Sequence, residues 1–143
     1  MDENTDEIRG YSGHRYWSLD ELAMVQPGLA RIMPDIGRRA GLLIHAARAQ
    51  NWPLAKFQID EIRELMELGS LTRPKYQFDL EEFIEKNLGE LEKAVKAQDL
   101  VKFEEEFAVA VRQANAYHDK HNKQFLVWKT PETPPPDMDL TPR

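Results

Sequence analysis

The stretch from Leu100 to Asn122, LVKFEEEFAVAVRQANAYHDKHN, is the part of the sequence that decides the fold. Apolar and aromatic residues recur in it at intervals of three and four, which places them on one face of a helix. Asp99 precedes this helix as an N-cap. The face begins aliphatic and aromatic and ends in imidazoles: Phe103, Phe107, Ala110, Val111, Ala114, Tyr117, His118 and His121. Its end is therefore either a polar helix terminus or a ligand site.

The same periodicity predicts four helices in all, over residues of about 27–50, 53–68, 77–97 and 100–122. Gly69 should end the second helix. Pro34 should kink the first helix rather than start a new one, because the apolar stripe keeps its phase across it. Short loops between long helices make neighbours antiparallel. We therefore expect an all-α fold over residues 16–128, an antiparallel up-down-up-down four-helix bundle.

The two ends of the chain differ from these helices. Residues 1–15 are expected to form a flexible acidic arm, because their few apolar side chains cannot offset the entropy lost on ordering. A capping box of Ser18 and Glu21 opens a short helix after the arm. Residues 129–143 form a proline-rich tail that cannot be helical. We expect this tail to be extended and mobile, with residues 125–128 anchoring its start on the bundle.

Composition bounds the function before any motif is considered. The 143 residues suffice for one domain, and 41% apolar with 31% charged residues is typical of a globular, soluble protein. The net charge of -6 argues against nucleic acid and against an anionic membrane surface. The chain has no cysteine, which excludes disulfides, thiolate metal sites, cysteine nucleophiles and thioether-linked haem.

Nothing in the sequence predicts membrane insertion or export. No apolar run approaches the length of a transmembrane helix. The N-terminus, MDENTDEIRG, is acidic and polar and does not resemble a secretory signal. We therefore expect a cytoplasmic protein as the sequence stands, and a periplasmic one if a signal peptide has been removed.

The search for catalytic motifs is negative. There is no Glu-x-x-His pair for a di-iron bundle, no phosphate-cradling glycine loop, no His-Glu-x-x-His and no Gly-x-Ser-x-Gly. The acidic run Glu104–Glu106 is interpreted as a solvated face, and His14 and His45 are expected at the surface. We therefore expect that the protein is not an enzyme.

His118 and His121 remain as candidate site residues. Three positions apart, they share a helix face and could hold a metal ion with outside ligands. Alternatively, they belong to a polar helix end, where imidazoles lie near the negative pole of the helix dipole. Both interpretations stay open.

The run Ala114-Asn115-Ala116-Tyr117-His118 lies where four-helix-bundle monohaem c-type cytochromes, of the cytochrome c′ kind, carry Cys-x-x-Cys-His. The chain resembles that family here, and more weakly from Gln26-Pro27-Gly28 through Asn51-Trp52 to the proline-rich end. The histidine of the motif is His118, and Ala114 and Tyr117 replace the two cysteines. Covalent attachment of haem is therefore impossible.

The resemblance implies two alternatives for function. The first is a cytochrome c′-like bundle that has lost its haem and acts without a cofactor, as a non-enzymatic binding or structural module. The second is a bundle that holds haem without covalent bonds, in electron transfer or ligand sensing. In that case His118, Met33, Tyr117 and Ala114 are the cofactor-binding residues.

Two expectations about the core follow. Tyr117 should occupy part of the space that haem fills in the family, so that side chains close the core near His118. Met33 lies about six residues, or about 9 Å, into the first helix, and His118 lies about 6 Å from the end of the last. The two are therefore level in the bundle and can act as an axial pair. The alternative is that Met33 is a flexible core filler.

Association with a second copy or with another protein is the remaining expectation. Relatives of the cytochrome c′ kind often pair through the helices at the front of the sequence. Five apolar residues outside the inner helix faces are candidates for such a surface, namely Trp17, Leu22, Met24, Val25 and Trp52.

Overall fold

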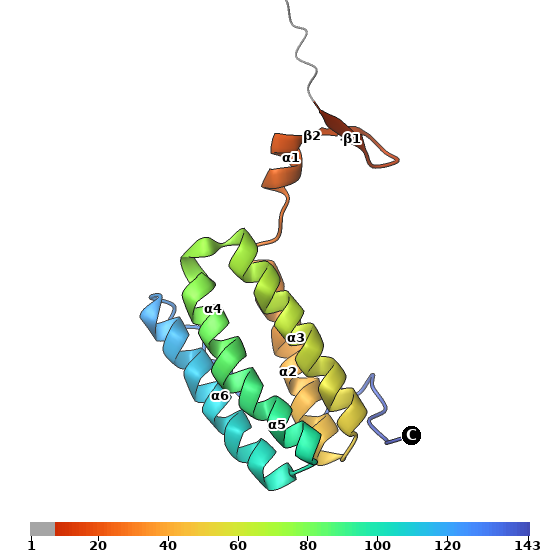
Figure 1. Cartoon of the computed structure of the whole chain (residues 1–143), viewed down its shortest axis with the longest axis vertical. Coiled ribbons are helices and arrows are strands. Elements are labelled where there is room, and N and C mark those ends of the chain that lie inside the picture. Colours follow the sequence, from red (N-terminus) through yellow and green to blue (C-terminus); the bar gives the residue numbers. More distant parts are fainter. Residues whose placement is uncertain (1–7) are drawn as a thin grey trace, which may run out of the picture.

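A computed structural model describes residues 8–143, and it confirms an all-α protein with very little strand (Figure 1). A small hairpin and a short helix α1 come first, followed by the long helices. The strands and helices are β1 Arg9–Tyr11, β2 Tyr16–Ser18, α1 Leu19–Met24, α2 Leu29–Arg48, α3 Trp52–Thr72, α4 Gln77–Phe83, α5 Gly89–Ala97 and α6 Leu100–Lys120. A 3-10 turn, Pro74–Tyr76, precedes α4, and a π-helical turn, Ile84–Leu88, joins α4 to α5.

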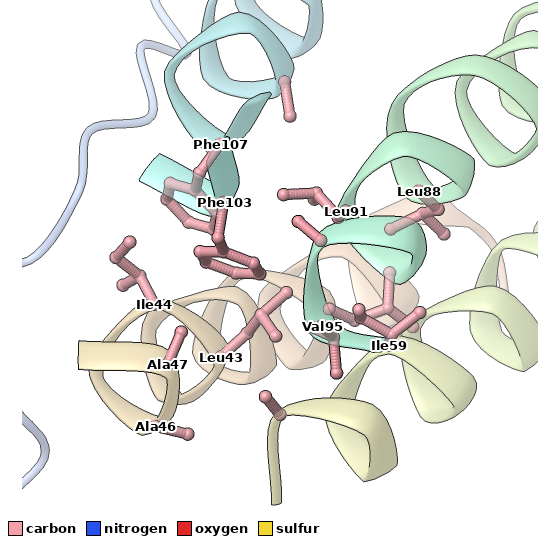
Figure 2. Packing of buried hydrophobic residues seen from close by; sticks show 14 of the residues in the cluster. Leu43, Ile44, Ala46, Ala47, Ile59, Leu88, Leu91, Val95, Phe103 and Phe107 are labelled. Atoms are coloured by element: carbon pink, nitrogen blue, oxygen red, sulfur yellow. The ribbon is translucent and has the colours of Figure 1, made fainter. Parts of the chain in front are cut away.

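The long helices lie side by side and share one core, which we call the helical body (residues 29–120). Helix α2 packs against α3 and α6, while α5 packs against both α3 and α6. Side chains of α2, α3, α5 and α6 converge in Figure 2. Phe103 of α6 is completely buried there, and its ring stacks on that of Phe107 at a centroid distance of 5.9 Å.

The helix ends agree with the predicted caps at several places. Ser18 and Glu21 form the capping box of α1, and the Asp99 side chain accepts from the N–H of Lys102 at the start of α6. Pro34 lies inside α2, so the helix does continue across it. Gly69, however, does not end α3, which runs on to Thr72.

Gly69 instead allows a close contact between helices. A Cβ at this position would lie 2.9 Å from Leu29 Cδ2 and 3.3 Å from Leu80 Cδ1, so glycine lets these two side chains approach α3 without having to shift. The π-helical turn within the predicted helix 77–97 is the second difference. A π-turn adds one residue to a helical turn and leaves no clear mark in the apolar periodicity.

The two ends of the chain make contacts in the structure that the sequence does not predict. Residues 1–7 of the expected arm lie outside the described residues, but Arg9–Tyr11 pairs with Tyr16–Ser18 as an antiparallel ladder. The C-terminal tail (residues 123–143) has no helix, yet it lies along α2. The His45 ring donates from Nε2 to the Pro131 carbonyl at 2.9 Å. The Asn51 amide donates to the Leu140 carbonyl at 3.1 Å.

His45 is buried, and the expectation of a surface histidine is therefore wrong. Its place off the main apolar stripe made it look exposed, but the tail covers that side of α2.

Among the described residues, 8–143, no helix combines the length and the apolar character needed to cross a membrane.

Candidate ligand-binding cavity

A partly open cavity of about 700 Å³ lies between the first half of α2, the second half of α6, and α4. Its walls are almost entirely apolar. They include Leu29, Met33, Ile36, Leu43, Ile62, Met66, Leu80, Phe83, Leu88, Phe107, Ala110, Val111, Ala114 and Trp128. The expectation that side chains close the core beside His118 is therefore wrong.

Small residues on two facing helices explain the space. Gly37 and Ala40 line the cavity from α2, and Ala110 and Ala114 line it from α6. None of them has a side chain longer than a methyl group. Tyr117 does lie on the wall, as expected, but one ring does not fill the volume left by four small residues.

The structure brings every predicted site residue to this one cavity. Met33 reaches it from α2, and Ala114, Tyr117 and His118 reach it from α6. His121, one turn after His118, lines it as well. Tail residues form a further part of the wall, namely Lys123, Phe125, Leu126, Val127 and Trp128.

His118 is held in one tautomer by the tail. Its Nδ1 lies 2.7 Å from the carbonyl oxygen of Leu126. Because a carbonyl only accepts, Nδ1 must carry the proton and donate it. In the neutral imidazole the other nitrogen, Nε2, is then an unprotonated acceptor, and it makes no hydrogen bond with any of residues 8–143. This is the arrangement in which a histidine binds a metal through Nε2 while its second nitrogen is fixed by a hydrogen bond.

Tyr117 keeps its proton. Its hydroxyl donates to Glu82 Oε1 at 2.7 Å, and its ring meets Phe83 edge-on at 6.5 Å. Burial, followed by the hydrogen bond and the charge of the adjacent carboxylate, raises the pKa of Tyr117 well above its usual range. The phenol is therefore a neutral group whose donor is committed to Glu82, and it offers the cavity mainly its ring.

Asp79 is the buried charge of this region. Burial raises its pKa, but hydrogen bonds from Lys120 at 2.7 Å and from His121 Nε2 at 2.6 Å outweigh burial and lower it overall. The His121 ring also meets Tyr76 edge-on at 4.9 Å. His121 Nε2 is thus engaged by a carboxylate, which fixes the ring at the end of α6.

The structure offers no support for a metal ion held by side chains alone. His118 and His121 each have one nitrogen occupied by another partner. Within residues 8–143 there is no group of three or more His, Cys, Asp or Glu side chains that could hold a metal ion. A larger ligand that needs only one imidazole suits the cavity better.

Sequence reasoning missed Asn115 and Leu126. The Asn115 amide donates to the Trp128 carbonyl and accepts from the Trp128 N–H, both at 2.9 Å. These bonds, like that of His118, go to backbone atoms of the tail, which carry no side-chain signature. The only clue in the sequence is a polar amide, Asn115, three residues before His118 on the same helix.

Comparison with known proteins found no matching protein-family model, no matching curated protein and no matching solved structure, so the chemistry of the cavity itself must carry the functional argument.

Proposed function

We propose that this protein is a cytochrome c′-like, up-down-up-down four-helix bundle that binds haem without covalent bonds, with His118 as ligand of the iron. One observation carries the proposal. An apolar cavity of about 700 Å³ has in its wall an imidazole whose Nδ1 is fixed by a carbonyl and whose Nε2 is unpaired among the described residues.

The residues present fit haem in size and chemistry. Pockets for large organic ligands span roughly 300–1,000 Å³ and are mostly apolar with a few polar groups. Haem iron is held by an axial side chain, which in several protein families is a histidine, and a cation near the haem carboxylates pairs with their charge. His118 supplies the imidazole, Met33 supplies a thioether on the same cavity, and the exposed Lys123 lies at its rim. Since the chain has no cysteine, the binding is non-covalent.

When bound, haem supplies an iron that carries an electron or binds a small gas molecule. The protein's own residues do the rest. His118 presents Nε2 in the required tautomer, and the apolar walls exclude water. Tyr117 remains a neutral phenol because its proton is held against Glu82. Electron transfer or ligand sensing is therefore the role that we propose.

The test is a titration of the purified protein with hemin, followed by the position and height of the Soret band. Wild type should saturate at one equivalent. His118→Ala should weaken binding by at least about tenfold and move the band, as expected for loss of an axial ligand. Met33→Ala should move the band with a smaller loss of affinity. His14→Ala, which removes an exposed imidazole from the hairpin, is the matched control and should behave as wild type.

Two results would contradict the proposal in different ways. If wild type shows only the spectrum of hemin in buffer, the haem assignment fails and the haem-free module remains. If wild type binds and both cavity substitutions leave the band and the affinity unchanged, hemin sits elsewhere and the axial assignment is wrong.

A second candidate role, self-association, is favoured by the N-terminal segment (residues 8–25). None of the residues of α1 is buried, and Leu22, Met24 and Val25 are exposed. Of the other predicted surface residues, Trp17 is half-buried under Arg15, and Trp52 is in the core. The expectation that Trp52 contributes to a docking surface is therefore wrong, because its side chain is buried in the core.

We infer that a second copy covers this segment. Sedimentation of the full chain should show a dimer, and Leu22→Glu with Met24→Glu should convert it to monomer. Val101→Glu, an equally exposed apolar site on α6, is the control and should leave the dimer intact. A wild-type protein that stays monomeric at high concentration would remove this role.

A further inference from the structure

The side-chain amide of Asn115 is paired twice with one residue of the tail. Nδ2 donates to the Trp128 carbonyl and Oδ1 accepts from the Trp128 N–H, each at 2.9 Å. Both bonds are short enough to be well formed. Together they fix the tail backbone at Trp128 relative to α6 in position and in direction, as a pair of ladder bonds fixes a strand.

The Trp128 side chain secures the same point from the other side. The indole packs edge-on against Phe107 at 6.0 Å. On α2, a Cβ at Gly37 would come within 3.2 Å of Trp128 Nε1, so glycine makes room for the ring. The tail is therefore held between α6 and α2 at this residue.

The carbonyl that orients His118 lies two residues before this fixed point. The chain leaves α6, turns back through the bonds Lys123 N–H to His118 O at 2.8 Å and Leu126 N–H to Lys123 O at 2.9 Å, and reaches Trp128. Leu126 is 47% exposed. Water can therefore compete for its carbonyl unless the segment is fixed at both ends.

We infer that Asn115 is a positioning residue for His118. By fixing the backbone at Trp128, it keeps the Leu126 carbonyl in reach of Nδ1, and so keeps His118 as the Nδ1–H tautomer with Nε2 available. Which nitrogen of a histidine is protonated is set by the hydrogen bond that the other makes. A neutral histidine freely exposed to water prefers the opposite tautomer, Nε2–H, which cannot bind iron through Nε2.

The purpose of this arrangement rests on the proposed function, but the tautomer is a property of the ligand-free protein and is measured without haem. The experiment is nitrogen NMR of histidine-labelled full-length protein at a pH where the imidazoles are neutral. The signals of His118 are identified by their loss in His118→Ala. In wild type we expect the Nδ1–H pattern.

Three variants separate positioning from general damage. Asn115→Leu removes both bonds at similar size and should move His118 toward the Nε2–H tautomer. Asn115→Asp keeps the acceptor for the Trp128 N–H but loses the donor, and should give an intermediate shift. Asn51→Ser is the control: serine still caps α3, while the bond to the Leu140 carbonyl at the far end of the tail is lost. It should leave His118 as in wild type.

The inference is overturned if Asn115→Leu folds, as judged by circular dichroism, and His118 keeps the Nδ1–H pattern. If Asn115→Leu does not fold, the same criterion applies to Asn115→Asp. Hemin affinity is measured separately, and if haem binds, Asn115→Leu should weaken it by about 10- to 100-fold, as for other outer-shell partners of metal ligands. A tautomer shift in a protein that does not bind hemin would support the positioning role while removing the proposed function.

Discussion

One half of the helical body is filled by side chains, whereas the other half surrounds a cavity. In the closed half, Phe103 of α6 is packed against α2, α3 and α5, and Ala47 and Ile59 have no exposed surface (Figure 2). In the cavity half, α2 lines the space with Gly37 and Ala40, and α6 lines it with Ala110 and Ala114. Protein interiors are normally close-packed, and unfilled volume costs stability. Of the two halves, only the closed one therefore gains the full stabilisation of close packing.

Removal of a large side chain should have the greatest effect, and only in the closed half. Phe103→Ala is expected to lower the free energy of unfolding by about 3–5 kcal/mol, because it removes a completely buried ring and leaves its volume unfilled. Phe83→Ala, which enlarges the existing cavity from a half-buried position, should cost clearly less. Urea unfolding of both variants measures the difference. Equal losses would mean that the two halves are packed alike.

Replacement of a small side chain by a large one should destabilise the closed half but not the cavity half. Ala47→Leu inserts three carbons into the closed half and should cost about 1–3 kcal/mol through overpacking. Ala114→Leu places the same atoms on the cavity wall, where there is room, and should leave stability unchanged or raise it. It should also weaken hemin binding by more than tenfold. An Ala114→Leu variant as unstable as Ala47→Leu would show that the cavity cannot accept atoms.

The polar end of the cavity half predicts a pH dependence. The Asp79 pKa is lower in the folded protein than in the unfolded chain, because the hydrogen bonds from Lys120 and His121 outweigh its burial. The folded state therefore releases this proton more readily. The stabilisation is fully present above the usual aspartate pKa and is lost as pH falls through the lower, folded value.

Asp79→Asn removes that contribution. At pH 7 the substitution should cost about 1–3 kcal/mol, the range for a hydrogen bond to a charged group. The cost should shrink as the pH falls below the usual aspartate pKa of about 4 and through the lower pKa of folded Asp79, where the wild-type side chain also becomes neutral. Asp119→Asn, an exposed carboxylate on α6, is the control and should show no comparable effect. A cost for Asp79→Asn that is independent of pH would contradict this account of Asp79.

The contrast between the closed half and the cavity half also shows which features of the core can be predicted from the sequence. Periodicity finds the residues that face inward, so it placed Met33, Ala114, Tyr117 and His118 on one interior surface. It does not measure volume, and Tyr117 alone suggested a closed core because the four small residues lie on two separate helices. Phe57 shows a similar limit of the apolar pattern, because this aromatic residue is 51% exposed and has the Arg39 guanidinium 6.0 Å from its ring centroid.

The tail was beyond prediction for a different reason. Its anchors are backbone groups, the carbonyls of Leu126, Pro131 and Leu140 and both polar atoms of Trp128, which every residue possesses. The proline-rich composition correctly excluded helix. It gave no sign of the buried His45, because the donor and its acceptor are 86 residues apart.

The smallest losses of stability should come from substitutions that remove the tail's contacts with α2. The loss should be larger for a buried contact than for an exposed one. The His45 ring is buried, and His45→Leu leaves the Pro131 carbonyl without its donor, which should cost about 1 kcal/mol. Arg38 pairs with Asp137 at 2.7 Å, but both side chains are about half exposed or more, so Arg38→Ala should change stability by less than about 1 kcal/mol. Hydrogen exchange of the tail amides provides the readout. Exchange near Pro131 should speed up in His45→Leu and stay close to wild type in Arg38→Ala. If Arg38→Ala releases the tail as strongly as His45→Leu, the tail is held on α2 by charge rather than by its buried hydrogen bond.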